Sequence, residues 1–171
     1  SIMTINQAIE RLKTGGVGVM PTDTLYGLVA SALKPSAVER VYSIKGRAPD
    51  KPCLILISDL TDLKKFNVRL DRVTLKLIRK LWPGKISIIL PLTRPAEKFS
   101  YLHRGTETLA FRRPDATWLR KFISQTGPLI APSANPEGAR PARTITSAKK
   151  YFRDRIDFYL AGQRQIGLTS T

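Results

Sequence analysis

The sequence predicts an α/β fold in which a twisted, mixed sheet is flanked by helices. Apolar runs of strand length alternate along the chain with stretches of helical period. Several runs are continuous rather than alternating, which is typical of strands covered on both faces. With 171 residues, of which 42% are hydrophobic, the chain is long enough for one substantial core. We therefore expect residues 1–171 to form a single domain.

The chain opens with a helix, a strand and a polar turn. Thr4 can cap a helix through about residue 13, where apolar residues recur at helical spacing until two glycines end the pattern. Val17–Met20 is an apolar run that ends at Pro21, and residues 22–27 follow as a polar turn. Such turns at strand ends often carry binding groups on α/β scaffolds.

A second helix, a basic loop and a buried strand come next. Pro35 suits the first turn of a helix, and Gly46 supplies its stop. Residues 45–52 form a basic loop stiffened by two prolines, and residues 53–57 form a continuous apolar strand.

The middle of the chain predicts helices, a strand and a long irregular segment. Polar pairs at 58–59 or 61–62 can cap a short helix, and an aspartate opens a stronger helix over 71–81. Residues 86–92 read as a strand. We expect residues 93–106 to be irregular and to move as a lid, because loops of that length are usually functional or mobile.

Strands and helices alternate again in the last third of the chain, separated by glycine and proline. The expected elements are a strand over 108–112, a helix over 116–125, a strand over 128–131, a polar turn over 132–138, a helix from Thr144 or Thr146 to about 152, and a strand over 156–160.

The chain carries 29 basic and 13 acidic residues, for a formal net charge of +16. A field of that sign attracts phosphate-bearing partners, so RNA and polyphosphates are candidates. A solvated basic surface kept for solubility is the plainer alternative. Because the cations are spread along the chain, we expect a basic face or groove rather than a disordered arm.

A single cysteine and a single histidine limit the chemistry that is available. Cys53 cannot form an internal disulfide, and its apolar neighbours predict a buried structural thiol. His103 alone cannot build a histidine metal site. There is no apolar run of membrane-spanning length and no secretory signal, so we expect a cytoplasmic protein that does not bind membranes.

Two groups of cations have the chemistry to bind an anionic substrate. Lys45, Arg47 and Lys51 could hold a polyphosphate, or they could form an exposed basic loop. Arg112 ends a predicted strand and could clamp a carboxylate, or it could pair with Asp115 or another nearby acid.

Hydroxyl, phenol and amide groups follow other predicted elements, and we expect them to converge with these cations, because the ends of different strands in an α/β sheet can meet at one pocket. Ser133 and Asn135 could hold phosphate or ribose oxygens, or could merely satisfy their own turn. Thr22 and Tyr26 could line a pocket, or could satisfy local backbone groups and pack in the core. Thr108 could add a hydroxyl, although threonine is common in strands for packing reasons alone.

Familiar nucleotide-binding and hydrolytic motifs are absent from the sequence. It contains no GxxxxGK[ST], GxGxxG, HExxH, GxSxG or paired CxxC. A bound nucleotide would therefore be held by side chains in a basic cleft. Catalysis by positioning and electrostatics, as in adenylyl or phosphoryl transfer, is the natural expectation.

Five segments together resemble the threonylcarbamoyl-AMP synthase family, the YrdC/TsaC-like proteins, in its short single-domain form. They are PTDTLYGL, KGRAPDKPCLILI, LWPGKISIILPL, TLAFRRP and APSANPEG, and the resemblance runs from about Ile5 to Ser170. It implies a twisted sheet around a large, positively charged cavity. It also implies conversion of L-threonine, bicarbonate and ATP to threonylcarbamoyl-AMP and pyrophosphate, with Mg²⁺.

The resemblance assigns roles to residues of this chain. Lys45 and Arg47 would be catalytic, contacting the phosphates of ATP as pyrophosphate leaves. The implied threonine-binding residues are Thr22, Tyr26, Arg112 and Ser133. The implied ATP-binding residues are Lys45, Arg47, Lys51, Thr108, Ser133, Asn135 and Arg143. The chain departs from the usual family pattern at Ala48, Cys53 and Glu137.

The resemblance also implies partners, and two other functions stay open. The product would serve the proteins that transfer threonylcarbamoyl to adenosine in tRNA, and direct contact with tRNA fits the charge. One alternative is a non-catalytic module that binds double-stranded RNA or tRNA. Another is formation of a carbamoyl adenylate from carbamoyl phosphate, as in the related domain of hydrogenase maturation proteins.

Overall fold

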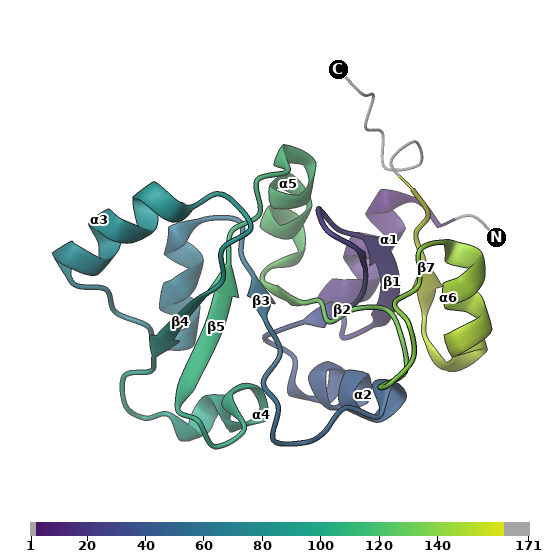
Figure 1. Ribbon diagram of the computed structural model, residues 1–171, viewed down its shortest axis with the longest axis horizontal. Helices are drawn as coiled ribbons and strands as arrows, with labels where there is room; N and C mark the ends of the chain where they lie inside the picture. The colour runs from purple at the N-terminus through teal and green to yellow at the C-terminus, as the bar shows by residue number, and fades with distance from the viewer. Residues whose placement is uncertain (1–2, 163–171) are drawn as a thin grey trace.

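A mixed sheet runs through the computed structural model, which describes residues 3–162 (Figure 1). Within these residues the strand order is β4-β5-β3-β6-β2-β1-β7. The strands are β1 (Val17–Pro21), β2 (Tyr26–Ser31), β3 (Ile55–Leu56), β4 (Ile88–Pro91), β5 (Thr108–Arg112), β6 (Leu129–Ile130) and β7 (Phe158–Tyr159). Among the strand pairs of these described residues, only β1/β7 and β3/β5 are parallel. The predicted mixed α/β sheet is thereby confirmed.

Helices flank this sheet, and their ends follow the predicted signals. The helices are α1 (Ile5–Lys13), α2 (Pro35–Lys45), η1 (Leu60–Phe66), α3 (Arg72–Leu81), η2 (Glu97–Phe99), α4 (Ser100–His103), α5 (Thr117–Thr126), α6 (Ile145–Phe152) and η3 (Arg153–Arg155). Thr4 caps α1, Asp71 caps α3 and Thr144 caps α6, each through its side chain. Gly46 ends α2 at a φ of +68°. None of the helices described here is long and apolar enough to cross a membrane.

Strand β2 was not predicted. Residues 22–27 were expected to form only a turn, but Tyr26 already pairs with Pro21, and the hairpin continues to the Val17–Ala30 pair. Glycine and alanine give β2 a weak strand propensity, so the local sequence carries little signal. The structure therefore shortens the polar turn to the four residues that connect β1 and β2.

The segment 93–106, expected to be irregular, is partly helical and packed. It contains η2 and α4, and the side chains of Phe99 and Leu102 are buried. His103 is also buried, and its Nε2 lies 3.0 Å from the carbonyl oxygen of Ala96 while its Nδ1 accepts a hydrogen bond from the backbone N–H of Gly105. His103 is thus a structural residue, and a lid motion of this segment stays a prediction.

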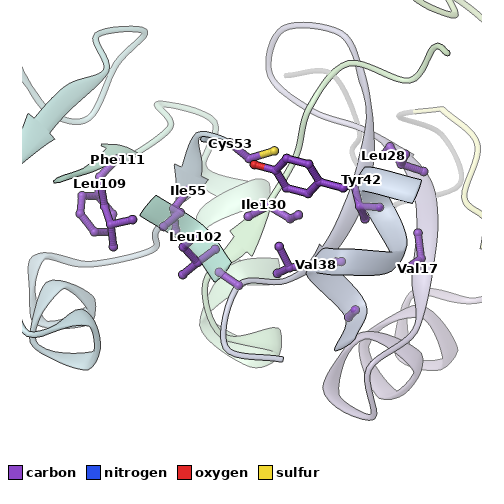
Figure 2. Close-up of a cluster of buried hydrophobic side chains, with 14 of the residues drawn as sticks. Val17, Leu28, Val38, Tyr42, Cys53, Ile55, Leu102, Leu109, Phe111 and Ile130 are labelled. Carbon is purple, nitrogen blue, oxygen red and sulfur yellow. The ribbon is translucent and has the colours of Figure 1, made fainter. Parts of the chain in front are cut away.

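The core has two layers, one on each face of the sheet. α1 and α5 pack on one face around Met20, Val29 and Leu129. The opposite face carries the neighbouring residues of the same strands, packed against α2, α6 and the aromatic side chains of η1 and η2. Figure 2 shows part of this second layer, including Val38 of α2. Burial on both faces explains why the strands read as continuous apolar runs.

The parallel pair β1/β7 joins the first strand of the sheet to the last one along the chain. A Cβ atom on Gly18 would lie 2.2 Å from the ring of Phe158, so only glycine fits there. Asp157 accepts a hydrogen bond of 2.8 Å from the backbone N–H of Val17 and pairs with both terminal nitrogens of Arg40, at 2.5 and 3.2 Å. One carboxylate thus holds β1, α2 and the start of β7 together.

Candidate active site

The polar turn after β6 is fixed against the beginning of β2 by backbone hydrogen bonds. The N–H of Leu28 donates to the carbonyl of Pro132 at 2.8 Å, and the N–H of Ala134 donates to the carbonyl of Tyr26 at 2.9 Å. Between them Gly27 and Ser133 form an isolated antiparallel bridge. The predicted convergence of the first and last polar segments is therefore present in the fold, because this turn extends the sheet alongside β2.

Lys45, the last residue of α2, donates into the same turn. Its ammonium Nζ lies 2.8 Å from the carbonyl of Ser133, 3.0 Å from the carbonyl of Asn135 and 3.2 Å from the Asn135 Oδ1. The Lys45 side chain is only 2% exposed. Burial lowers the pKa of Lys45, and the carboxylate of Glu137, 3.5 Å away, partly opposes that shift. Lys45 is thus a buried cation that holds the turn in place.

Ser133 and Asn135 are bonded to one another and to their own turn. The Ser133 hydroxyl donates to the Asn135 Oδ1 at 2.5 Å. The Asn135 amide nitrogen donates to the carbonyls of Pro136 and Ala139, at 2.9 and 3.0 Å. Local satisfaction, the alternative noted for this turn, is therefore real for the amide of Asn135. The turn is rigid, and its shape is set by side chains as well as by its prolines.

Arg47 lies beside the same cluster, on the basic loop. Its Nη2 donates to the carbonyl of Pro52 at 2.7 Å and its Nε to that of Lys51 at 3.3 Å. Glu137 stands between the two cations, 3.5 Å from Lys45 Nζ and 3.9 Å from Arg47 Nη1. The Lys51 side chain itself is exposed. The guanidinium of Arg47 thus holds the backbone of the loop that carries both Arg47 and Lys51.

Tyr42 of α2 contacts the backbone of the basic loop. Its hydroxyl donates to the carbonyl of Lys51 and faces the sulfur of Cys53 (Figure 2). Burial, together with Cys53, raises the pKa of Tyr42 to about 12, and burial likewise raises the pKa of the Cys53 thiol. The guanidinium carbon of Arg104 lies 3.6 Å from the Tyr42 ring centroid. The predicted buried, structural Cys53 is confirmed, whereas Tyr42 and Arg104 were not singled out from the sequence.

Arg112 pairs with Asp23 rather than with Asp115. Its Nη1 lies 2.6 Å from Asp23 Oδ2 and its Nη2 lies 2.9 Å from Asp23 Oδ1. Both side chains are buried, at 6% and 9% exposure. This contact brings the end of β5 to the turn between β1 and β2. Sequence reasoning missed Asp23 as a partner, although the turn that contains it had been singled out.

Thr22 and Tyr26 flank the turn that carries Asp23. The Thr22 hydroxyl donates to the carbonyl of Leu25 at 2.5 Å, so part of its capacity is used within the turn. The Tyr26 hydroxyl accepts a hydrogen bond of 3.2 Å from the N–H of Gly162. Tyr26 lies beside the Ser133 turn, because its carbonyl accepts a hydrogen bond from the N–H of Ala134, whereas the hydroxyl of Thr22 is used within its own turn.

Two residues assigned to ATP are less closely connected to this cluster. Thr108 begins β5 and Arg112 ends it, so their Cα atoms are about 13 Å apart. The Thr108 hydroxyl contacts that of Thr106 at 3.2 Å. Arg143 is exposed and follows Ala142, whose N–H donates to the carbonyl of Ala134. Arg143 thus lies near the turn, whereas Thr108 lies at the far end of its strand from Arg112.

A separate cavity of about 730 Å³ lies between η1 and α3 and contains none of the predicted site residues. Its basic lining residues are Lys64, Arg69, Arg79 and Arg94. A single large basic cavity over the candidate site stays a prediction. Within residues 3–162 no cluster of three or more His, Cys, Asp or Glu side chains could hold a metal ion.

Comparison with known proteins gives a consistent result over most of the chain. A family model named Sua5/YciO/YrdC, described as "Telomere recombination", matches residues 10–171. The chain is 36% identical over 141 residues to the threonylcarbamoyl-AMP synthase of Bacillus subtilis, covering 82% of this chain and 40% of that protein. It is 32% identical over 163 residues to the threonylcarbamoyl-AMP synthase of Halorhodospira halophila, covering 93% and 83%.

A solved structure of P. abyssi Sua5 complexed with L-threonine has the same fold. The match has a TM-score of 0.81 and 29% sequence identity, and it covers 92% of this chain and 46% of that one. The chain therefore spans less than half the length of two of these relatives and most of the length of the third.

Proposed function

Because the chain belongs to the Sua5/YciO/YrdC family, we propose that it is an L-threonylcarbamoyladenylate synthase, a nucleotidyltransferase that acts in tRNA threonylcarbamoyladenosine modification. The names of its relatives support this proposal. So does the site itself: Lys45 draws the Ser133 turn to the end of α2, next to Arg47. That arrangement gathers cations and hydroxyls around one rigid turn, as adenylyl transfer by positioning and electrostatics requires.

The reaction that we propose has two bond-forming steps. The amine of L-threonine loses a proton and attacks the carbon of bicarbonate, and water leaves to give the N-carboxylated threonine. A carbamate oxygen then attacks the α-phosphorus of ATP, and the bond from that phosphorus to the β-phosphate oxygen breaks. Threonylcarbamoyl-AMP and pyrophosphate are the products. No protein side chain is assigned as the base for the first step.

The residues divide between the two ends of this reaction. Arg47 would contact the phosphates and stabilise the charge that develops as pyrophosphate leaves. Lys45 has its ammonium turned into the protein, so its contribution would be to fix the turn and to lend positive potential. The proposed threonine contacts are Thr22, Tyr26, Arg112 and Ser133. The further proposed ATP contacts are Lys51, Thr108, Asn135 and Arg143.

Mg²⁺ is proposed with ATP, but the described residues do not form a site dedicated to it. They contain no cluster of metal ligands, and Asp23, the carboxylate of the β1–β2 turn, is committed to Arg112. Magnesium commonly keeps several waters and binds substrate phosphates. The ion would therefore arrive with the nucleotide, and we derive no step from it.

The proposed partners follow from the product and from the charge. Threonylcarbamoyl-AMP would pass to the proteins that modify tRNA, and the net charge of +16 favours contact with tRNA. A cytoplasmic location fits such work and stays our expectation. A non-catalytic RNA-binding module is the alternative that this charge favours. Its RNA affinity would fall steeply with salt, and it would produce no adenylate.

Rapidly quenched mass spectrometry tests the proposal directly. The protein is incubated with ATP, magnesium, bicarbonate and L-threonine, and we expect an adduct that depends on threonine together with pyrophosphate. Pyrophosphate released with carbamoyl phosphate in place of threonine and bicarbonate would favour the carbamoyl-adenylate reaction instead. A folded protein that gives neither product would leave the RNA-binding function.

Arg47→Ala is expected to reduce turnover by about 10²–10³-fold, the loss typical for removing one group that stabilises transition-state charge. Arg69→Ala is the matched control, because Arg69 is an exposed arginine that lines the separate cavity. Initial rates of pyrophosphate release are the measurement. Equal rates for the two variants would show that the phosphate site lies elsewhere.

A further inference from the structure

Asp23 and Arg112 form a buried pair whose hydrogen bonds can be counted. A guanidinium has five N–H donors in a fixed plane. Asp23 accepts one hydrogen bond from Nη1 at 2.6 Å and one from Nη2 at 2.9 Å. The second Nη1 hydrogen is directed to the carbonyl of Gly84 at 3.4 Å. Three of the five donors are therefore committed: the two on the terminal edge to Asp23, and the outer hydrogen of Nη1 to Gly84.

The two donors that are left share one edge of the guanidinium. They are the Nε hydrogen and the second Nη2 hydrogen, and neither donates a hydrogen bond to an acceptor within residues 3–162. Two parallel N–H groups on one edge match the two oxygens of a carboxylate. Arg112 therefore keeps one pair of parallel N–H donors that can bind a second carboxylate, while Asp23 occupies the other pair.

We propose that Asp23 is a positioning residue: it holds the terminal edge of Arg112 so that the Nε–Nη2 edge is presented to the carboxylate of the amino-acid substrate. This inference rests on the proposed function, because it takes L-threonine as the substrate. It assigns to Asp23 a role that neither the sequence nor the proposed mechanism gave it. Asp23 does not touch the substrate but acts through Arg112.

The surroundings of Asp23 favour positioning over simple blocking of the site. A residue that merely blocked Arg112 would have to leave when substrate binds. Asp23 instead stands on a four-residue hairpin connection that is tied by the Thr22 hydroxyl and backbone to Leu25. Both members of the pair are buried, so separating them would leave two unpaired charges. We therefore expect the Asp23–Arg112 ion pair to stay intact while substrate binds.

Positioning and blocking predict opposite changes in affinity when Asp23 loses its charge. Asp23→Asn keeps the shape of the side chain but weakens its hold on Arg112. If Asp23 positions Arg112, L-threonine should bind about 10- to 100-fold more weakly, the range for losing an ionic hydrogen bond. If Asp23 blocks Arg112, L-threonine should bind more tightly.

Calorimetric titration with L-threonine and with L-threoninamide, which lacks the carboxylate, separates these outcomes. We expect Asp23→Asn to weaken binding of L-threonine and to leave the weaker binding of L-threoninamide unchanged. In steady-state assays the KM for threonine should rise by the same factor, with kcat and the KM for ATP little changed. Asp157→Asn is the control, because it loosens another carboxylate–guanidinium pair outside the site and should leave threonine affinity unchanged.

Unchanged or tighter binding of L-threonine by Asp23→Asn would overturn the inference. If that variant does not fold, Asp23→Glu decides, since it keeps the charge but shifts the guanidinium by the length of one methylene. Weaker threonine binding by Asp23→Glu supports positioning, and wild-type affinity refutes it. Failure of the wild-type protein to bind L-threonine at all would count against the proposed function instead.

Discussion

Lys45 illustrates how one buried residue can hold the shape of a site. Four oxygens of Ser133 and Asn135 lie within 3.4 Å of its ammonium, and its side chain is buried. Removing it leaves those acceptors without their cation, and Glu137 keeps only Arg47, at 3.9 Å. The conformation of the turn would then be lost.

Lys45→Ala is therefore expected to lower the free energy of unfolding by about 1–3 kcal/mol, the cost of leaving buried polar groups unsatisfied. Lys51→Ala, on the loop that follows Lys45 and exposed, should change it by no more than about 0.5 kcal/mol. Urea denaturation followed by circular dichroism measures both values. Equal stability of the two variants would show that the hydrogen bonds of Lys45 contribute nothing net.

At the residue scale, the sequence identified the members of the site better than their contacts. The segments around Thr22, Lys45 and Ser133 were singled out, and the fold brings them together. The pairing of Arg112 could not be found in this way, because its partner Asp23 is 89 positions away and Asp115 is the nearer acid in sequence. Ion pairs between residues that the sheet brings together cannot be predicted from their spacing in the sequence.

Elements with strong local signals were the ones that could be predicted. Side-chain caps at Thr4, Asp71 and Thr144 mark three helix starts correctly. Strand β2 was missed because its backbone partners, rather than its residues, make it a strand. Residues 97–103 were missed as helix because two short helical turns give too few residues for a period to show.

Helix α3 shows how unevenly burial can be distributed over one element. Among its residues only Ile78 is buried, whereas Val73 and Leu77 are 80% and 55% exposed. Ile78→Ala should therefore destabilise the protein by about 2–5 kcal/mol, the usual cost of truncating a buried Ile. The neighbouring Leu77→Ala should cost no more than about 0.5 kcal/mol. Thermal denaturation of both variants tests this, and similar losses would mean that α3 is covered on its outer face.

At the scale of the whole molecule, the α/β class and the mixed sheet could be predicted, but the strand order could not. Apolar runs such as 53–57 report burial on both faces, and they do not report which strands are neighbours. Thus nothing near residues 156–160 indicates that they pair with Val17–Pro21. The net charge similarly indicates a partner class without locating its surface.

Asp157 ties distant parts of the molecule together, and its titration should be visible in global stability. Burial alone would raise the pKa of Asp157, but hydrogen bonds from Arg40 and from the backbone of Val17 outweigh it and hold the pKa below 3.8. The unfolded chain therefore takes up the proton first as pH falls. The stabilisation is complete above the unfolded pKa and is lost as pH drops through the folded one.

We accordingly expect the difference in unfolding free energy between wild type and Asp157→Asn to be constant from pH 7 to about pH 5 and to shrink towards pH 3. Guanidinium chloride denaturation at each pH measures it. A difference that grows in acid would mean that the folded protein, and not the unfolded chain, protonates Asp157 first.

The pairing of β1 with β7 also has a consequence for synthesis on the ribosome. Domains generally fold as units, with their N-terminal parts made first. Here the N–H of Val17 and the guanidinium of Arg40 receive their carboxylate from a residue made 140 and 117 positions later. A nascent chain that ends before Asp157 has an open sheet edge at β1, where Gly18 offers no side chain to cover it. The growing polypeptide must keep that edge from pairing with other chains until almost all of the sheet has been translated.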